Sequence, residues 1–88
     1  MKKIPDWFVE DVKPQRDFTL VISFANGEIR IYDAHELLSD AMFAPLKRLS
    51  FFMKAHRSGH SVVWNDDIDI APEFLFENSR PYNSSFVQ

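Results

Sequence analysis

The dipeptide Asn26-Gly27 constrains the fold of this chain most strongly, because it separates two runs of alternating apolar and polar residues. Asn-Gly is favoured in two-residue type I′ hairpin turns, whose central residues both need a positive φ. This turn predicts an antiparallel hairpin over residues 18–32 in which Phe24 pairs with Ile29. The hairpin then has an apolar face (Phe18, Leu20, Ile22, Phe24, Ile29 and Ile31) and a polar face (Thr19, Ser23, Glu28 and Arg30).

Two shorter signals predict the elements on either side of this hairpin. A first strand is expected over residues 7–12, ahead of Pro14, because proline cannot donate a hydrogen bond to a sheet ladder. After the hairpin, Asp33 and Glu36 have the spacing of a capping box, in which each side chain caps the other's backbone amide. A short helix is therefore expected over residues 34–38.

The second half of the chain carries its own turn and helix signals. Gly59 suits the turn of a second hairpin between residues 55–57 and 61–64. Pro72 is well placed at the first position of a final helix. Together these elements predict an α+β fold, a small two-layer domain with an antiparallel sheet of about five strands and short helices packed on one face.

Size and composition predict one domain in a reducing compartment. The chain has 88 residues, 45% of them hydrophobic and none of them cysteine. We expect a single α+β domain over residues 1–78 and a flexible polar tail over residues 79–88. The absence of cysteine, of a membrane-length apolar run and of a signal-peptide core predicts a cytoplasmic protein that does not interact with membranes.

No recognisable constellation of catalytic or metal-binding residues stands out. Both glycines are assigned to turns, and no Gly-x-Ser-x-Gly motif is present. The three histidines lack a zinc-ligand spacing, and the acidic stretch Asp66–Glu73 lacks the glycine and distal glutamate of a calcium loop. We therefore expect no enzyme activity and no cofactor, and a small enzyme or metal-binding domain stays as an alternative.

Two blocks of residues give the chain a family resemblance. One block is Phe43-Ala44-Pro45-Leu46, and the other runs from Trp64 through Asp69-Ile70-Ala71-Pro72 to Leu75-Phe76. Over roughly residues 9–77 the chain resembles the small bacterial family catalogued as domain of unknown function 2442 (DUF2442). It departs from the family pattern at Asn65, where proline is more common, and at Phe76, where tyrosine is more common. The resemblance implies a small α+β domain for which no activity is established.

The resemblance also implies a partner. Members commonly lie beside a second small protein, and some carry a helix-turn-helix domain, which implies a regulatory role such as that of an antitoxin in a two-gene pair. The surplus of aromatic residues agrees with a protein-interaction module, because aromatic side chains and arginine dominate binding hot spots. The candidate interaction surface comprises Trp7, Phe8, Arg30, Tyr32, Trp64 and Asp69.

Two further kinds of partner are considered. A homodimer could form if the strand over residues 7–12 lies at a sheet edge. A nucleic-acid-linked regulator would use the basic segment 47–57, which holds Lys47, Arg48, Lys54 and Arg57 and no acidic residue. The net charge of −3 argues against nucleic acid as the main partner, because phosphate binding requires concentrated positive charge.

Overall fold

The computed structural model describes residues 4–82 and shows an α+β domain with two antiparallel sheets and short helices. In chain order the elements are β1 (Val9–Pro14), β2 (Thr19–Phe24), β3 (Ile29–Asp33), the 3₁₀ helices η1 (Ala34–Leu37) and η2 (Ala41–Lys47), α1 (Leu49–Phe52), β4 (His56–Ser58), β5 (Ser61–Asn65), β6 (Ile68–Ile70), α2 (Pro72–Asn78) and β7 (Arg80–Pro81). The fold class expected from the sequence is confirmed. Its strands are divided between two sheets.

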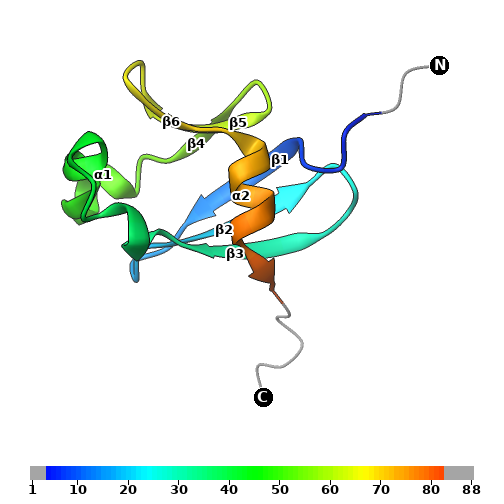
Figure 1. Ribbon diagram of the computed structural model, residues 1–88, viewed down its shortest axis with the longest axis horizontal. Coiled ribbons are helices and arrows are strands. Elements are labelled where there is room, and N and C mark those ends of the chain that lie inside the picture. Colours follow the sequence, from blue (N-terminus) through cyan, green and yellow to red (C-terminus); the bar gives the residue numbers. More distant parts are fainter. Residues whose placement is uncertain (1–3, 83–88) are drawn as a thin grey trace.

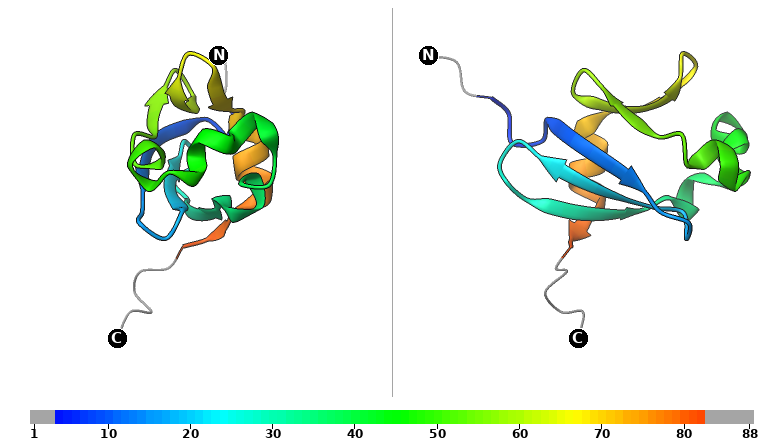
Figure 2. Two further views of the ribbon diagram at one scale, coloured as in Figure 1. Left: turned by 90° about the vertical axis from the view of Figure 1, so that its left-hand side faces the viewer. Right: turned by 180° about the vertical axis from the view of Figure 1, so that it is seen from behind.

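The larger sheet has the strand order β1-β2-β3-β7, and the smaller has the order β4-β5-β6. In Figure 1, α2 crosses one face of the larger sheet, and the smaller sheet lies beyond the β1 side of it. The views in Figure 2 show α1 and the preceding segment at one end of the molecule, away from the turn between β2 and β3. β1 is linked to the turn between β4 and β5, where the Val9 amide donates to the His60 carbonyl over 3.1 Å.

The central hairpin forms, but its register differs by one residue from the predicted one. Leu20 pairs with Tyr32 and Ile22 with Arg30. The loop holds three residues, because the Phe24 amide donates to the Glu28 carbonyl at 2.9 Å and Gly27 alone takes a positive φ, of 90°. This geometry is that of a three-residue loop with a glycine bulge. A loop whose last residue is glycine can adopt it in place of the two-residue type I′ turn.

The shift changes which side of β3 faces the core. On β2 the predicted core residues Leu20, Ile22 and Phe24 are buried. On β3, however, Tyr32 is fully buried and Ile29 is 47% exposed. The apolar face predicted for β3 is therefore wrong, since Ile29 and Ile31 point away from the core and Arg30 and Tyr32 point toward it.

Helix α2 covers the core face of the larger sheet. The Phe76 ring packs edge-on against Phe24, with ring centroids 5.0 Å apart, and Phe74 packs similarly against Tyr32 at 5.9 Å. Leu75 between them is fully buried. As expected, Pro72 begins this helix, and Gly59 forms the second hairpin turn with a φ of 62°.

The outer strands of the larger sheet are short or interrupted. β1 begins at Val9, two residues later than predicted, and has a bulge between Val9 and Asp11. Its last residue is Pro14, and β7 ends with Pro81. Residues 79–82 are part of the domain, since Arg80 pairs with Ile31 and the Tyr82 amide donates to Ile29; the rest of the expected flexible tail lies outside the described residues.

Two local features complete the description. Phe18 has a φ of 65°, a strained conformation for a bulky residue, and its half-buried ring packs against Phe52 at 5.1 Å. Within residues 4–82, none of the helices has the length and apolar character needed to cross a bilayer.

Candidate binding surfaces

Two of the predicted interaction residues belong to the core. Tyr32 is fully buried, and Trp64 is 4% exposed. The Trp64 indole Nε1 donates to the Phe52 carbonyl at 2.9 Å, which satisfies its polar atom within the core. The prediction that these two rings form a surface is wrong, because the register of β3 and the pairing of β5 turn them inward.

Arg30 is also removed from the predicted surface. Its guanidinium donates to Glu28 Oε1 and Ser79 Oγ, both at 2.8 Å, and to the Ser79 carbonyl. It also lies 5.1 Å from the centre of the Phe76 ring. With only 16% of its side chain exposed, Arg30 ties the end of α2 to the sheet and has little surface left for a partner.

Trp7 and Phe8 lie together at the start of β1. The Phe8 ring stacks on His60 with centroids 3.8 Å apart and planes 11° apart, and Trp7 meets Phe8 edge-on at 5.0 Å. A pocket beside them is lined by Ile4, Phe8, Val9, Glu10, Ala25, Arg57 and His60. Both predicted rings are half-buried here, and the stacking of His60 on Phe8 was not predicted from the sequence.

The predicted basic patch is divided in two. Arg57 lines the pocket beside Phe8, where its guanidinium donates to the Gly59 carbonyl at 2.7 Å. Lys47 and Arg48 line a different cavity, which we call the basic pocket (Ala44, Pro45, Lys47, Arg48 and Phe51), with a volume of about 600 Å³. The Lys54 ammonium lies 5.9 Å from the centre of the Phe51 ring, so three of the four cations lie in or beside the basic pocket.

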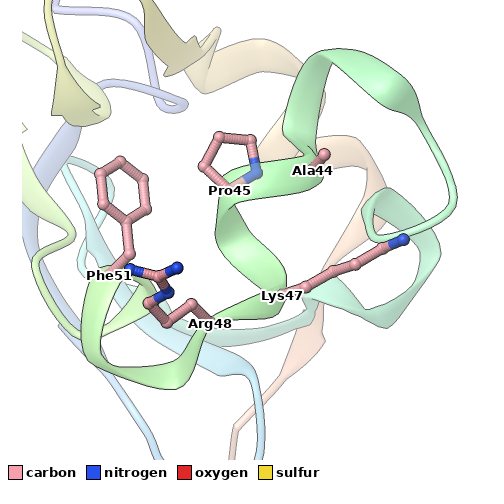
Figure 3. A pocket seen from close by; sticks show the side chains of 5 residues that line it. All are labelled: Ala44, Pro45, Lys47, Arg48 and Phe51. Carbon is pink, nitrogen blue, oxygen red and sulfur yellow. The ribbon is translucent and has the colours of Figure 1, made fainter.

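Figure 3 shows how the side chains of the basic pocket are arranged. The Pro45 and Phe51 rings stand on opposite sides of the opening, and the Arg48 side chain is directed toward Phe51, whereas Lys47 extends another way. Lys47 and Arg48 are exposed, and neither forms an ion pair with any carboxylate of residues 4–82. Their positive charges are therefore available to a ligand.

Asp69, the last predicted interaction residue, lines a second cavity on the other side of η2. We call it the acidic groove (Leu37, Asp40, Phe43, Asp69, Ile70, Ala71 and Phe74), and its volume is about 350 Å³. Asp40 Oδ1 accepts from the Met42 amide at 2.9 Å and thereby caps η2. Phe74 is 39% exposed, and Met42, which precedes Phe43 in η2, is 68% exposed.

The polar network near η1 has a structural role. The Tyr32 hydroxyl donates to Glu36 Oε2 at 2.6 Å, and burial together with this carboxylate raises the pKa of Tyr32. Asp33 Oδ1 accepts from the His35 amide at 3.0 Å and lies 2.6 Å from His35 Nδ1, contacts that lower the pKa of Asp33. Glu36 thus bonds to Tyr32, where a capping box would direct it to the amide of Asp33.

In the part of the chain that the structure describes, no group of three or more His, Asp or Glu side chains is arranged to hold a metal ion. The sequence model of the family described as "Protein of unknown function (DUF2442)" matches residues 9–81. The chain belongs to this family. Comparisons with curated proteins and with solved structures find no match.

The fold explains how the two blocks that carry the DUF2442 resemblance are related in space. In this DUF2442 chain, Phe43 from the first block and Asp69, Ile70 and Ala71 from the second line the same acidic groove. Leu46 is fully buried, and Ala44 and Pro45 line the basic pocket. The blocks therefore meet around η2, which separates the two cavities.

The sequence did not indicate this meeting point. Phe74 was one of the surplus aromatic residues, but its position in the sequence gave no reason to place it beside Phe43 or Asp40. The available signal was the apolar stretch Met42–Leu46 in a segment that Pro45 keeps out of a regular helix. Such a segment cannot bury all of its side chains against one sheet.

Proposed function

We propose that this chain is a non-catalytic protein-binding module that binds its partner on the η2 surface, defined as the basic pocket and the acidic groove together. The observation that supports it is that three aromatic rings with part of their surface accessible are gathered beside one short helix. Phe43 and Phe51 are half-buried and Phe74 is 39% exposed, and all three line the two cavities beside η2. Three other aromatic rings, those of Tyr32, Trp64 and Phe24, lie inside the core.

The physical reason is that interface energy concentrates at aromatic side chains that a partner can bury in a pocket. Met42, which is 68% exposed on η2, adds a flexible apolar side chain that adapts to different partner shapes. The charged residues at the rim, Asp40, Lys47, Arg48 and Asp69, would fix the orientation of the partner. A small protein encoded next to this chain is the expected partner, and an antitoxin-like role is one form of this function.

Co-expression with the product of the neighbouring reading frame tests the proposal. The tagged chain should recover that product, and Phe74→Ser should abolish recovery because it removes an apolar anchor from the acidic groove. Ile29→Ser is the matched control, since Ile29 is a similarly exposed apolar residue, at 47%, but lies at the opposite end of β3 from η1. Thermal unfolding of both variants checks that each is folded.

The proposal fails if Phe74→Ser and Phe43→Ser both recover the partner as well as Ile29→Ser does. Recovery of no protein by the unaltered chain, with the neighbouring product present in soluble form, would also contradict it. Either result would leave the accessible rings of the η2 surface without a binding role.

A nucleic-acid-linked role is the second candidate. It is supported by Lys47 and Arg48 in the basic pocket and by Lys54 beside its Phe51 ring, because single-stranded nucleic acid binds to cations and stacking rings together. It is weakened by the separate position of Arg57 and by Asp40 and Asp69 across η2. Salt-dependent binding of a deoxythymidine oligonucleotide would support this role, and no binding at low salt would exclude it.

A further inference from the structure

We infer that the partner segment that enters the basic pocket is a short acidic stretch of protein with an apolar side chain beside its carboxylates. This inference rests on the proposed function, and it adds the chemistry that the partner must present. Three observations support it: the cations that pair with no carboxylate of residues 4–82, the two rings that flank the opening, and the hydrogen-bonded backbone of Arg48.

The first observation is the local charge. Lys47 and Arg48 line the pocket, Lys54 lies against its Phe51 ring, and the chain has no acidic residue between Asp40 and Asp66. None of these cations is bonded to a carboxylate within the described range 4–82. An anionic group that binds here would therefore not have to displace an internal ion pair.

The second observation is the shape of the pocket. Pro45 and Phe51 offer apolar ring faces on opposite sides of the opening, and the Arg48 guanidinium lies on the Phe51 side (Figure 3). A ligand that places an apolar side chain between the rings brings a neighbouring carboxylate within reach of Arg48. An arginine can hold such a carboxylate with two parallel hydrogen bonds.

The third observation is that the backbone under Arg48 is fixed. Its amide donates to the Pro45 carbonyl at 3.2 Å, and its carbonyl accepts from the amides of Phe51 and Phe52 at 3.0 and 2.9 Å. These bonds hold the turn between η2 and α1 in one conformation. Binding then has to order side chains and not this turn of the backbone, which reduces the entropy lost on association.

The neighbouring acidic groove favours a short acidic segment over a nucleic-acid strand. Asp40 caps η2 at the end opposite to Lys47, and Asp69 lines the groove on the far side of this helix. A uniformly negative strand that continued past η2 would approach these carboxylates and be repelled. A protein segment can present carboxylates to the basic pocket and neutral or cationic side chains to the groove.

A peptide titration followed by amide NMR tests the inference. The probes are a capped peptide containing Glu-Phe-Glu, the same peptide with both glutamates replaced by glutamine, and a short deoxythymidine oligonucleotide. We expect the Glu peptide to shift the amides of Ala44, Lys47, Arg48 and Phe51. The Gln peptide should bind about tenfold more weakly, as loss of one charge-assisted hydrogen bond implies.

Variants separate the pocket from general charge attraction. Arg48→Gln should weaken the Glu peptide about tenfold. Lys13→Gln, which removes an exposed cation on β1, should leave its affinity unchanged. The inference is overturned if the two peptides bind equally, if the shifts occur away from the basic pocket, or if the oligonucleotide binds there more tightly than the Glu peptide.

The same variants distinguish this inference from the proposed function. If Phe74→Ser abolishes recovery of the co-expressed partner and Arg48→Gln does not change it, the acidic-segment inference is wrong and the protein-binding function stands. If neither variant reduces recovery, the η2 surface is not the binding site and both proposals fail.

Discussion

The Tyr32 hydroxyl donates a 2.6 Å hydrogen bond to the Glu36 carboxylate, while its ring lies fully buried beneath α2. Burial is the main cause of the raised pKa of Tyr32, since the low-dielectric core disfavours the phenolate, and the nearby Glu36 acts in the same direction. The pair fastens the start of η1 to the sheet. It also makes the free energy of unfolding depend on pH in the alkaline range.

The sign of this dependence follows from the two states of the protein. An unfolded tyrosine ionises near pH 10, whereas the folded Tyr32 keeps its proton to higher pH. The free energy of unfolding is therefore unaffected by this group below about pH 10 and falls as the pH rises above it. Urea titrations at increasing alkaline pH should show that decline.

Substitution identifies the group responsible. Tyr32→Phe should lower the stability at neutral pH by about 1 kcal/mol through the lost hydrogen bond, and it should flatten the alkaline decline. Tyr82→Phe is the matched control, because Tyr82 follows β7 and lies outside the buried core. An alkaline decline that persists unchanged in Tyr32→Phe would contradict the assignment.

The register of the central hairpin predicts a contrast between two apolar residues. Phe24→Ala should cost about 3–5 kcal/mol, because a buried ring that packs against Phe76 would be replaced by a cavity. Ile29→Ala should change stability by less than about 0.5 kcal/mol, because Ile29 is 47% exposed. Chemical denaturation of both variants measures the difference; similar losses would favour the two-residue turn over the observed loop.

The loop itself gives a second contrast. Gly27 has a φ of 90°, and a Cβ placed there would meet no atom of the described residues within 4 Å. Gly27→Ala should therefore cost about 1–2 kcal/mol through backbone strain alone. Gly27→Asn should cost less, because asparagine tolerates positive φ better. Equal stability of the alanine variant and the unaltered chain, measured by thermal unfolding, would show that the loop can adopt another conformation.

The hydrogen bonds of Arg30 to Ser79 hold the end of α2 against the sheet. Arg30→Lys should destabilise the protein by about 1–3 kcal/mol, because an ammonium cannot reproduce the planar fork that bonds Ser79 and Glu28 together. Glu28→Gln should have a much smaller effect, since that carboxylate is 47% exposed. Hydrogen exchange at Tyr82 reports directly on β7, and faster exchange in Arg30→Lys only is the expected result.

The elements could largely be predicted because their signals are local. The strand β2, the turn at Gly59 and the start of α2 at Pro72 depend on neighbouring residues only. The register of β3 could not be predicted in the same way. The Asn26 side chain accepts a hydrogen bond from the Glu28 amide at 2.9 Å, and this bond forms within the three-residue loop. The dipeptide Asn-Gly is therefore compatible with a loop of three residues as well as with a turn of two.

Tertiary contacts then select between the two registers. In the segment Ile29–Tyr32, either the two isoleucines or the pair Arg30 and Tyr32 can face the core, depending on the register. Burying Tyr32 and Arg30 is acceptable only because Glu36 and Ser79, which are distant from the turn, accept their hydrogen bonds. No pattern within the hairpin reveals those partners.

The candidate site was least accessible to prediction, because each cavity combines segments that are far apart in the sequence. Asp40 and Phe43 meet Asp69 and Phe74 only when α2 folds over the sheet. Arg57 was grouped with Lys47 by proximity in the chain, yet β4 carries it to a different pocket. Charge runs in a sequence therefore overstate how much charge is concentrated at one place.

The prolines that end β1 and β7 have a consequence for how this protein meets other molecules. Each removes a backbone donor from an outer strand of the larger sheet, and the bulge in β1 distorts the remaining donors. These features discourage extension of the larger sheet from one copy to the next. For the partner that we propose, these two strand edges offer little backbone to pair with, so its contacts with the larger sheet would come from side chains.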